Sequence, residues 1–411
     1  MTTTSHAPFS LRSIAVPAFG PALLFSIGEG AILPVVALSA RDLGASVAVA
    51  ALIVTLIGLG SWFFNLPASL ITLKFGERWA MVGAAAASTV ALAAAALSPL
   101  LPEGIWLLAA AMVVVGMAAS VFSLARQKYL TEAVPVIIRA RALSTLGGVN
   151  RIGIFIGPFV GALVVAHWGV SAAYVVGFVS SSAALLCVLL VRDITSGHDH
   201  RQRLPRRSVA GVLAEHRHTL MTLGVGVLFI AAARACRIAL IPLFAESIGL
   251  SAAQTSLVVG IAGAVDMLLF YPAGGVMDRY GRMWVALPSM VILAIGMVLL
   301  PFAHSFGSLT AAAVVLGLGN GIGAGLVMTL GADASPADAR VQFLGGWRLM
   351  ADLGNAAGPA AISLITIAFP LGVAAVAMGG AAVVGAGWLR AWLPRFDPVV
   401  RATSAHRGSS D

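Results

Sequence analysis

The chain has 411 residues, of which 59% are hydrophobic and 10% are charged, and its mean hydropathy is +0.98. A soluble domain of this length needs more charge to cover its surface, so the composition argues against a soluble globular protein. The formal net charge of +9 is also found in proteins that bind nucleic acid. However, the basic residues recur in the gaps between apolar runs, as the positive-inside rule predicts for a membrane protein, so we expect no nucleic-acid partner.

Twelve apolar runs follow one another, each long enough for a membrane-spanning helix of about 20 residues. They are residues 14–40, 47–68, 79–98, 105–125, 142–166, 172–191, 219–245, 255–276, 283–303, 308–332, 343–369 and 371–393. The runs are continuous rather than alternating, which argues against a transmembrane β-barrel. The first run is too long for a signal-peptide core and contains Glu29, so we expect no cleavable signal peptide. The pattern predicts an all-α membrane protein with 12 transmembrane helices.

The distribution of Lys and Arg predicts the orientation in the membrane. With the amino terminus in the cytoplasm, 20 of the 25 Lys and Arg residues fall in cytoplasmic segments, and only Arg41 falls on the opposite side. The other four lie inside the runs. We therefore expect a multi-pass protein of the cytoplasmic (inner) membrane with both termini in the cytoplasm.

The two halves of the chain repeat. The matching positions, at an offset of 205 or 201 residues, are Gly44/Gly249, Ser46/Ser251, Pro67/Pro272, Gly76/Gly281, Gly153/Gly354, Gly157/Gly358 and Pro158/Pro359. This repeat predicts an N-terminal six-helix bundle (1–192), a cytoplasmic linker (193–218), a C-terminal six-helix bundle (219–394) and a cytoplasmic tail (395–411). Six helices repeated in the same orientation are typical of transporters with a substrate site between the halves.

The segment after the eighth run carries a specific motif. It reads Gly-x-x-x-Asp-Arg-x-Gly-Arg at Gly274, Asp278, Arg279, Gly281 and Arg282. It resembles the cytoplasmic signature of the major facilitator superfamily. The resemblance implies the two-repeat fold of that superfamily and a conformational role for these residues as a charge latch. The first-half counterpart, residues 69–78, has Leu73 where the acid is expected. The latch is therefore asymmetric, or its partner comes from elsewhere.

The fifth run contains a second motif, Gly-x-x-x-Gly-Pro-x-x-Gly, at Gly153, Gly157, Pro158 and Gly161. It resembles the antiporter signature of the superfamily, which is associated with drug:proton antiporters, and it implies a surface for bending and sliding. Ordinary small-residue helix packing is the alternative. One departure counts against the drug-antiporter assignment. That group has an arginine early in the fourth helix, whereas Arg126 comes late in this chain and is expected at the cytoplasmic end.

Seven charged residues lie deep inside the apolar runs, where each needs a partner. They are Glu29, Arg151, Arg234, Arg237, Asp266, Arg348 and Asp352. Arg348 and Asp352 are one helical turn apart and can pair, and Asn355 extends their face. Arg234 and Arg237 share a face and repel each other unless an acid or a substrate lies between them. The repeat aligns Glu29 with Arg234, and Arg151 with Asp352. The resemblance implies that the helices bearing these charges flank a central cavity. Arg151, Arg234, Arg237, Arg348 and Asn355 are therefore predicted cavity residues.

A proton-coupled carrier needs a carboxylate that loads and releases a proton. Burial and a nearby arginine shift a carboxyl pKa in opposite directions, so an ion pair that breaks during the cycle can change proton affinity. The candidates, in order, are Glu29, Asp266 and Asp352. Fixed salt bridges that hold helices together are the alternative interpretation.

The sequence therefore predicts a secondary active transporter that works by alternating access. The leading interpretation is a proton-coupled antiporter that exports small amphipathic molecules or drugs, with protons, substrate and lipid as its partners. A symporter or exchanger of a small organic anion is the alternative, favoured by four buried arginines against three acids. A transport-dead receptor or sensor is the alternative of another class. No catalytic, ATP-binding or metal-binding motif is recognised, so we expect a protein that is not an enzyme and has no cofactor. We also expect it to be a monomer.

Overall fold

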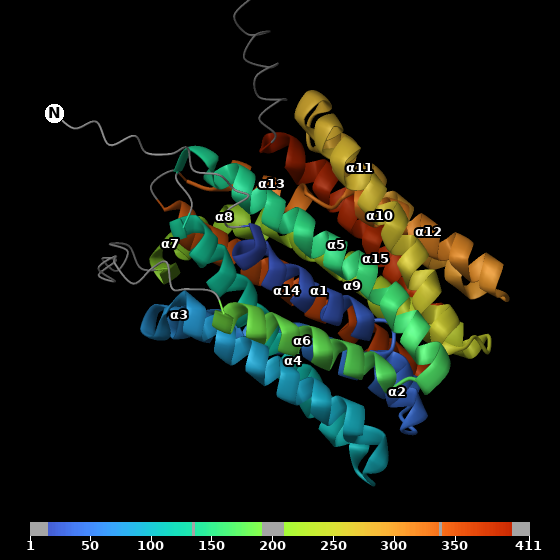
Figure 1. The fold of residues 1–411 in the computed structure, drawn as a ribbon. Coiled ribbons are helices and arrows are strands. Elements are labelled where there is room, and N and C mark those ends of the chain that lie inside the picture. The colour runs from blue at the N-terminus through green and yellow to red at the C-terminus, as the bar shows by residue number, and fades with distance from the viewer. Residues whose placement is uncertain (1–14, 134–135, 191–208, 337–338, 397–411) are drawn as a thin grey trace, which may run out of the picture.

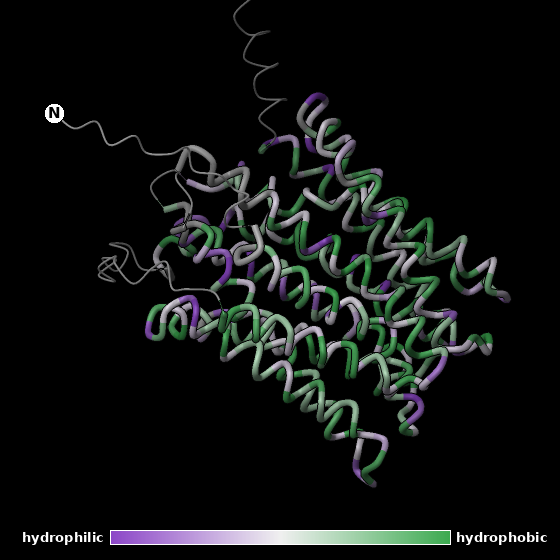
Figure 2. The backbone as a smooth tube through the Cα atoms, in the orientation of Figure 1, coloured by the Kyte–Doolittle hydropathy of each residue, from purple (hydrophilic) through white to green (hydrophobic). Residues whose placement is uncertain are grey.

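The computed structural model describes residues 15–133, 136–190, 209–336 and 339–396. Throughout these ranges the regular elements are helices, most of which lie side by side along one axis (Figure 1). We call the end of the bundle with the short helices α7 (Val209–Glu215) and α8 (Arg217–Thr219) the α7 end. The opposite end, where α2 lies, is the α2 end. Hydrophilic residues gather at both ends, while apolar residues cover most of the length between them (Figure 2).

The first half contains the six predicted spans. Its helices are α1 (Ala15–Ile32), α2 (Val36–Asp42), α3 (Val47–Leu97), η1 (Ser98–Leu100), α4 (Gly104–Ala133), α5 (Val136–Trp168) and α6 (Ala172–Leu190). The first span is broken, since α1 and α2 meet at an angle of 41°. The second and third spans form one hydrogen-bonded element, α3, which turns at Gly76.

The second half repeats this order. Its helices are η2 (Leu220–Gly224), α9 (Val225–Ser247), α10 (Ala252–Tyr280), α11 (Met283–Leu299), η3 (Leu300–Phe302), α12 (Phe306–Ile322), α13 (Leu326–Ala334), α14 (Arg340–Ala368), α15 (Leu371–Trp392) and η4 (Leu393–Arg395). The tenth predicted span is divided between α12 and α13. Several helices extend beyond the apolar runs, because a helix can continue into water after its apolar stretch has ended.

The helices fit the prediction of a twelve-span membrane protein. In the described part of the chain, ten helices are long and apolar enough to cross a membrane, or eleven if α1 and α2 count as one span. The remaining predicted span, the eleventh apolar run (343–369), is α14, which has 29 residues but is more polar, because it carries Arg348, Asp352 and Asn355. Charged residues inside a spanning helix are costly in lipid, so this helix is expected to face the interior of the bundle.

The repeat is visible in the backbone. Gly76 and Gly281, 205 residues apart, both have positive φ, at 80° and 98°. Both lie at the α7 end, where the chain turns tightly from one span into the next. Glycine adopts this conformation without steric cost. Ser46 and Ser251 cap α3 and α10 at equivalent positions, where each side chain accepts a hydrogen bond from a backbone N–H three residues on.

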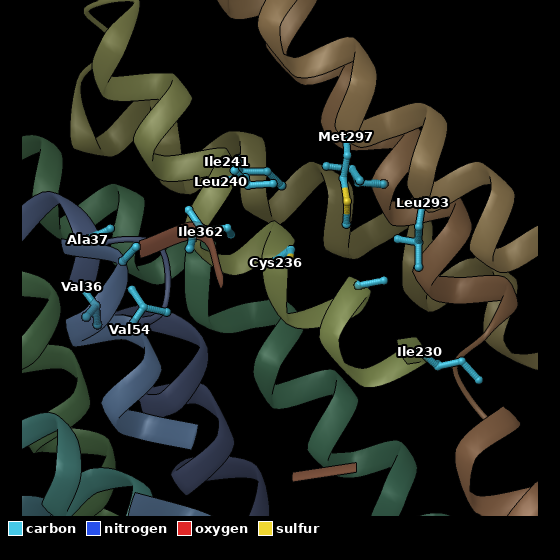
Figure 3. Close-up of a cluster of buried hydrophobic side chains, with 14 of the residues drawn as sticks. Val36, Ala37, Val54, Ile230, Cys236, Leu240, Ile241, Leu293, Met297 and Ile362 are labelled. Atoms are coloured by element: carbon cyan, nitrogen blue, oxygen red, sulfur yellow. The ribbon is translucent and has the colours of Figure 1, made fainter. Parts of the chain in front are cut away.

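The two halves share one apolar core toward the α2 end. Val36, Ala37 and Val54 of the first half belong to the same buried cluster as Ile241 and Ile362 of the second half (Figure 3). A second buried cluster draws its members from the first half alone, on α1, α3, α4, α5 and α6. The shared core indicates that the halves are held firmly together on the α2 side of the bundle.

Polar contacts strengthen the same junction. Arg41 Nε lies 3.0 Å from both carboxylate oxygens of Glu246, and the two residues are 205 positions apart, so they are repeat equivalents. Nearby, Ser363 Oγ donates a hydrogen bond of 2.7 Å to the Ala48 carbonyl. These contacts therefore hold the two halves together at the α2 end.

Candidate functional site

A cavity of about 200 Å³ lies among the helices of the first half. Its walls come from α1, α3, α4 and α5, and Arg348 of α14 contributes from the second half. The lining residues are Phe25, Ser26, Glu29, Ser61, Ala119, Ser120, Phe122, Ser123, Arg126, Asn150, Ile154 and Arg348. Three charges therefore face one small space: Glu29, Arg126 and Arg348.

Glu29 is the acid of this cavity. Among the residues that the structure describes, its carboxylate has no hydrogen bond or ion pair, and Arg126 is the charge that acts on it. Arg126 is only 4% exposed. Its Nη2 donates to Asn150 Oδ1 at 2.8 Å, and its guanidinium lies 5.4 Å from the centre of the Phe122 ring. Because Arg126 lines the same cavity as Glu29, its position can change when the Glu29 carboxylate gains or loses a proton.

The side chain of Arg126 reaches the cavity. The sequence placed Arg126 at the cytoplasmic end of the fourth span, just after the apolar run that ends at residue 125. The helix α4 continues to Ala133, about two turns further, so Arg126 lies within it and reaches the cavity. The end of an apolar run was therefore a poor guide to the end of the helix.

Asn150 joins three helices at the cavity. Its Oδ1 accepts hydrogen bonds from Arg126 of α4 and, at 3.2 Å, from Ser26 of α1. The next residue on α5, Arg151, points to the second half instead, where its Nη2 donates to the Ala324 carbonyl at 3.1 Å. Consecutive residues of α5 thus connect the Glu29 cavity to the opposite half of the molecule.

A second charged group, the arginine cluster, surrounds Asp266 of α10. We define it as Arg151, Arg234, Arg237, Asp266 and Asn320. Arg151 Nη1 lies 3.9 Å from Asp266 Oδ1, and Arg237 Nη2 lies 3.6 Å from Asp266 Oδ2. Asn320 Nδ2 donates to Asp266 Oδ2 at 2.6 Å, and Arg234 Nε donates to Asn320 Oδ1 at 2.7 Å. Two arginines therefore pair with the Asp266 carboxylate, and Arg234 is connected to it through Asn320.

The third group crosses between the halves at α14. Arg348 Nε lies 3.9 Å from Asp352 Oδ2 on the same helix. Asn65 Nδ2 of α3 donates to that carboxylate, and Ser120 Oγ of α4 donates to Asn65 Oδ1 at 2.6 Å. Asn355, predicted on the same face, has an exposed side chain and no described hydrogen bond here. Asp352 is thus tied to an amide of the other half as well as to its own arginine.

These two crossing contacts follow the repeat. Arg151 and Asp352 were aligned by the sequence, and they lie on the equivalent helices α5 and α14. Arg151 reaches Asp266 on α10, and Asp352 reaches Asn65 on α3, the equivalent of α10. Arg151 of the first half therefore contacts the second half, and Asp352 of the second half contacts the first. The aligned pair Glu29 and Arg234 does not meet, since each belongs to a different polar group.

The glycine motif of α5 packs directly on α1. A Cβ added at Gly153 would lie 2.6 Å from Ser26 Cβ, and one added at Gly157 would lie 2.5 Å from the Ala31 nitrogen. Gly161 is less tight, at 3.1 Å from the Ala31 carbonyl oxygen. The helix continues through Pro158 to Trp168. Equivalent glycines of α14, such as Gly358, lie against α9 at Ala232.

The signature segment after the eighth span has a partner in the structure. Arg282 Nε donates to Asp333 Oδ2 of α13 at 2.8 Å, and its Nη1 donates to the Met277 carbonyl at 2.9 Å. Arg279 stacks its guanidinium over Tyr280, 5.4 Å from the ring centre. Gly274 has open space beside it. The side chain of Asp278, the predicted acid of the latch, lies outside the described residues.

The first half holds the same ion pair with its charges exchanged. Glu77 pairs with Lys128, and these residues match Arg282 and Asp333 at the offset of 205. Glu77 is 1% exposed. It lies one turn after Leu73, the residue that stands where the signature motif has its acid. The first-half counterpart is therefore altered rather than absent, since it ties α3 to α4 by a different acid.

We expect the Glu77–Lys128 pair to stabilise the first half. Glu77→Gln removes the acid of the pair. This costs about 3–5 kcal/mol in a fully buried pair, and we expect about 2–3 kcal/mol here because the Lys128 side chain is 25% exposed. The apparent Tm of the purified protein should therefore fall. The exchange Glu77→Lys with Lys128→Glu reproduces the charge order of the second half and should recover most of the loss. An unchanged Tm in Glu77→Gln would contradict a structural role for this pair.

Sequence reasoning missed several residues of these networks. Asn65, Asn150 and Asn320 each connect a charged residue to another helix. Asn320 is a lone amide in the glycine-rich run of residues 308–332, and it carries no charge to mark it. An amide in an apolar run is a signal worth using, because it needs hydrogen-bond partners as a charge does. In the described part of the chain, no group of three or more His, Cys, Asp or Glu side chains is placed to hold a metal ion.

Comparison with protein families agrees with this architecture. The profile of the Major Facilitator Superfamily matches residues 19–232 and 223–409. The chain belongs to the major facilitator superfamily. The superfamily resemblance and the predicted fold class, two six-helix repeats forming 12 spans, are therefore confirmed. A search of curated proteins found no match.

Solved structures of this superfamily have the same fold. The inward-open xylose transporter XylE from E. coli has a TM-score of 0.72 at 16% identity, covering 94% of this chain and 97% of that one. The nucleoside transporter NupG has a TM-score of 0.73 at 15% identity, with coverages of 92% and 99%. A POT family transporter in complex with 5-aminolevulinic acid has a TM-score of 0.73 at 12% identity, with coverages of 96% and 98%. At these identities the likeness establishes the fold alone, and this chain is a multi-pass membrane transporter of the superfamily.

Proposed function

We propose that this chain is a proton-coupled antiporter that exports small amphipathic molecules by alternating access, with Glu29 as the proton-binding group. The observation that carries the proposal is the Glu29 carboxylate. It faces a cavity beside Arg126 and has no described hydrogen bond or ion pair. A carboxylate fixed in a salt bridge would serve structure, whereas one left open to a cavity is available to bind and release a proton.

The surroundings of Glu29 support a coupling role. Arg126 faces it from α4 and Arg348 from α14, so two positive charges respond to its ionisation. Protonation removes the negative charge that Arg126 faces, so Arg126 is then held by its hydrogen bond to Asn150 on α5. Because Arg151 follows Asn150 and contacts Asp266 in the other half, a shift of α5 would reach the junction between the halves. Asp266 and Asp352 are weaker candidates, since each already has described partners.

The same proposal includes the placement in the membrane. We assign the α7 end to the cytoplasm and both termini to that side of an inner membrane, because the Lys and Arg count favours this orientation. The halves 1–192 and 219–394 then move as two bodies around the central charges. A single copy contains all the residues invoked here, so we propose that the monomer suffices for transport.

The test is transport by the full-length protein in liposomes under an imposed pH gradient. Ethidium, tetraphenylphosphonium, benzoate and hexanoate are tested, with protein-free vesicles as the baseline for passive leak. Antiport predicts accumulation when the lumen is acidic, whereas symport predicts accumulation when the external medium is acidic. No gradient-driven flux of any compound above the baseline would overturn the proposal.

Glu29→Gln separates coupling from binding. Its amide keeps the size of the side chain but cannot cycle a proton, so gradient-driven accumulation should fall at least about twentyfold while exchange of substrate without a gradient continues. Glu103→Gln is the matched control, because Glu103 is exposed in the connection between η1 and α4. Gradient-driven transport at the wild-type rate in Glu29→Gln would remove Glu29 from the coupling mechanism.

A further inference from the structure

Within the described residues, the arginine cluster carries an excess of positive charge. Glu29 faces Arg126 and Asp352 faces Arg348, so these two groups balance. In the cluster, Arg234 and Arg237 lie on the same helix, and Asp266 is the described carboxylate beside them. Arg234, Arg237 and Asp266 alone leave a formal excess of one positive charge. Buried charge of one sign is costly without a counter-charge, so this position favours an anion.

Two of these arginines have hydrogen-bond donors to spare. A guanidinium has five N–H donors. Arg237 makes no described hydrogen bond, and its Nε is buried without a partner, since its contact with Asp266 is an ion pair of 3.6 Å. Arg234 uses only its Nε, on Asn320. The two residues lie three positions apart on α9 and so share one face of the helix. Paired forks of this kind match the two oxygens of a carboxylate.

The neighbouring surface is apolar and aromatic. Phe155 and Phe159 follow Arg151 at one and two turns along α5, and their rings are in edge contact at 5.2 Å. They face Gly263 and Gly260 of α10, the helix that carries Asp266. A ligand that places its anionic group among the arginines would therefore have an apolar wall beside its body.

The charged side chains of the cluster are not fully enclosed. Arg151, Arg237 and Asp266 keep exposed fractions of 27%, 20% and 16%. These groups are therefore accessible in part to a ligand.

We propose that the arginine cluster is the substrate site and that it binds the carboxylate of a small apolar organic acid. This inference rests on the proposed transport function and gives its substrate class. Arg237 and Arg234 hold the two carboxylate oxygens, while Asn320 and Asp266 fix the orientation of Arg234 and Arg237. The Phe155 and Phe159 rings contact the apolar body. Glu29 lies in a separate cavity, so substrate and proton occupy different sites that are linked through Asn150 and Arg151.

The experiment is calorimetric binding to the purified full-length chain in detergent, without any gradient. The probes are benzoate and hexanoate, their neutral amides benzamide and hexanamide, and inorganic phosphate. We expect at least one acid to bind about tenfold or more tightly than its amide. Absence of binding by both acids, equal binding of acid and amide, or binding of phosphate alone would each overturn the proposal.

Variants locate the site. Arg237→Gln should weaken binding of the acid by about 10- to 100-fold, because it removes charge-assisted hydrogen bonds. Arg237→Lys keeps the charge without the fork and should lose less. Arg390→Gln, an exposed arginine at the end of α15, should bind as wild type does. Wild-type affinity in Arg237→Gln would place the acid elsewhere and contradict the assignment. The binding assay uses no gradient, so a failure of proton coupling in liposomes remains distinguishable from a failure of this inference.

Discussion

Replacing Gly157 by valine should abolish transport and destabilise the protein. A Cβ at Gly157 would lie 2.5 Å from the Ala31 nitrogen and 2.6 Å from the Ile27 carbonyl oxygen, both backbone atoms of α1 that cannot rotate away. Overpacking a well-packed interior typically costs about 1–3 kcal/mol, and a backbone contact places this variant at or above the upper end. The helices α1 and α5 must separate to admit the side chain. We therefore expect a transport rate at least about a hundredfold lower, with a reduced Tm.

Gly148→Val on the same helix is the control for this substitution. An added Cβ at Gly148 meets nothing within 4 Å, so the same loss of backbone freedom occurs without a clash. Transport and Tm should stay near the wild-type values. If Gly157→Val transports normally in liposomes, the α1–α5 contact is not needed in the transport cycle, and the glycine motif is ordinary packing.

The fold was accessible from the sequence because membrane insertion imposes strong local rules. Runs of about 20 apolar residues must form helices, since the backbone has no other hydrogen-bond partner in lipid. The repeat was also readable, because Gly76 and Gly281 mark turns that need positive φ. Helix ends were less accessible. The helix α4, for example, continues to Ala133, although its apolar run ends at residue 125.

The candidate site was only partly accessible. A charged residue in an apolar run is easy to recognise, so Glu29, Arg151 and Asp266 were identified as candidate residues from the sequence. Their partners were not, because pairing depends on how helices pack in three dimensions rather than on sequence spacing. The repeat alignment matched Arg151 with Asp352 as equivalent positions, but the two residues do not meet. Arg151 contacts Asp266, and Asp352 contacts Asn65. Equivalent positions in a repeat occupy equivalent places in opposite halves, and they meet only near the symmetry axis, as Arg41 and Glu246 do.

Asp266→Asn should be among the most damaging substitutions in the second half. The amide has almost the same shape and can still accept a hydrogen bond from Asn320, so the loss is one of charge. Arg151 and Arg237 are then left without their carboxylate. Removing one partner of a fully buried pair costs about 3–5 kcal/mol, and we expect about 2–3 kcal/mol here, because these side chains are 16–27% exposed. The measurement is the Tm of the purified protein.

A double-mutant cycle shows whether this loss arises from arginine repulsion. Adding Arg237→Gln to Asp266→Asn removes one of the three positive charges, so the double variant should be more stable than Asp266→Asn alone. The coupling between these two contacting residues should reach about 1 kcal/mol or more. Additive losses would mean that Asp266 supports the fold through Asn320 rather than by holding the arginines together. In that case the arginines tolerate one another without a counter-charge, and the physical reason for expecting an anion between them is lost.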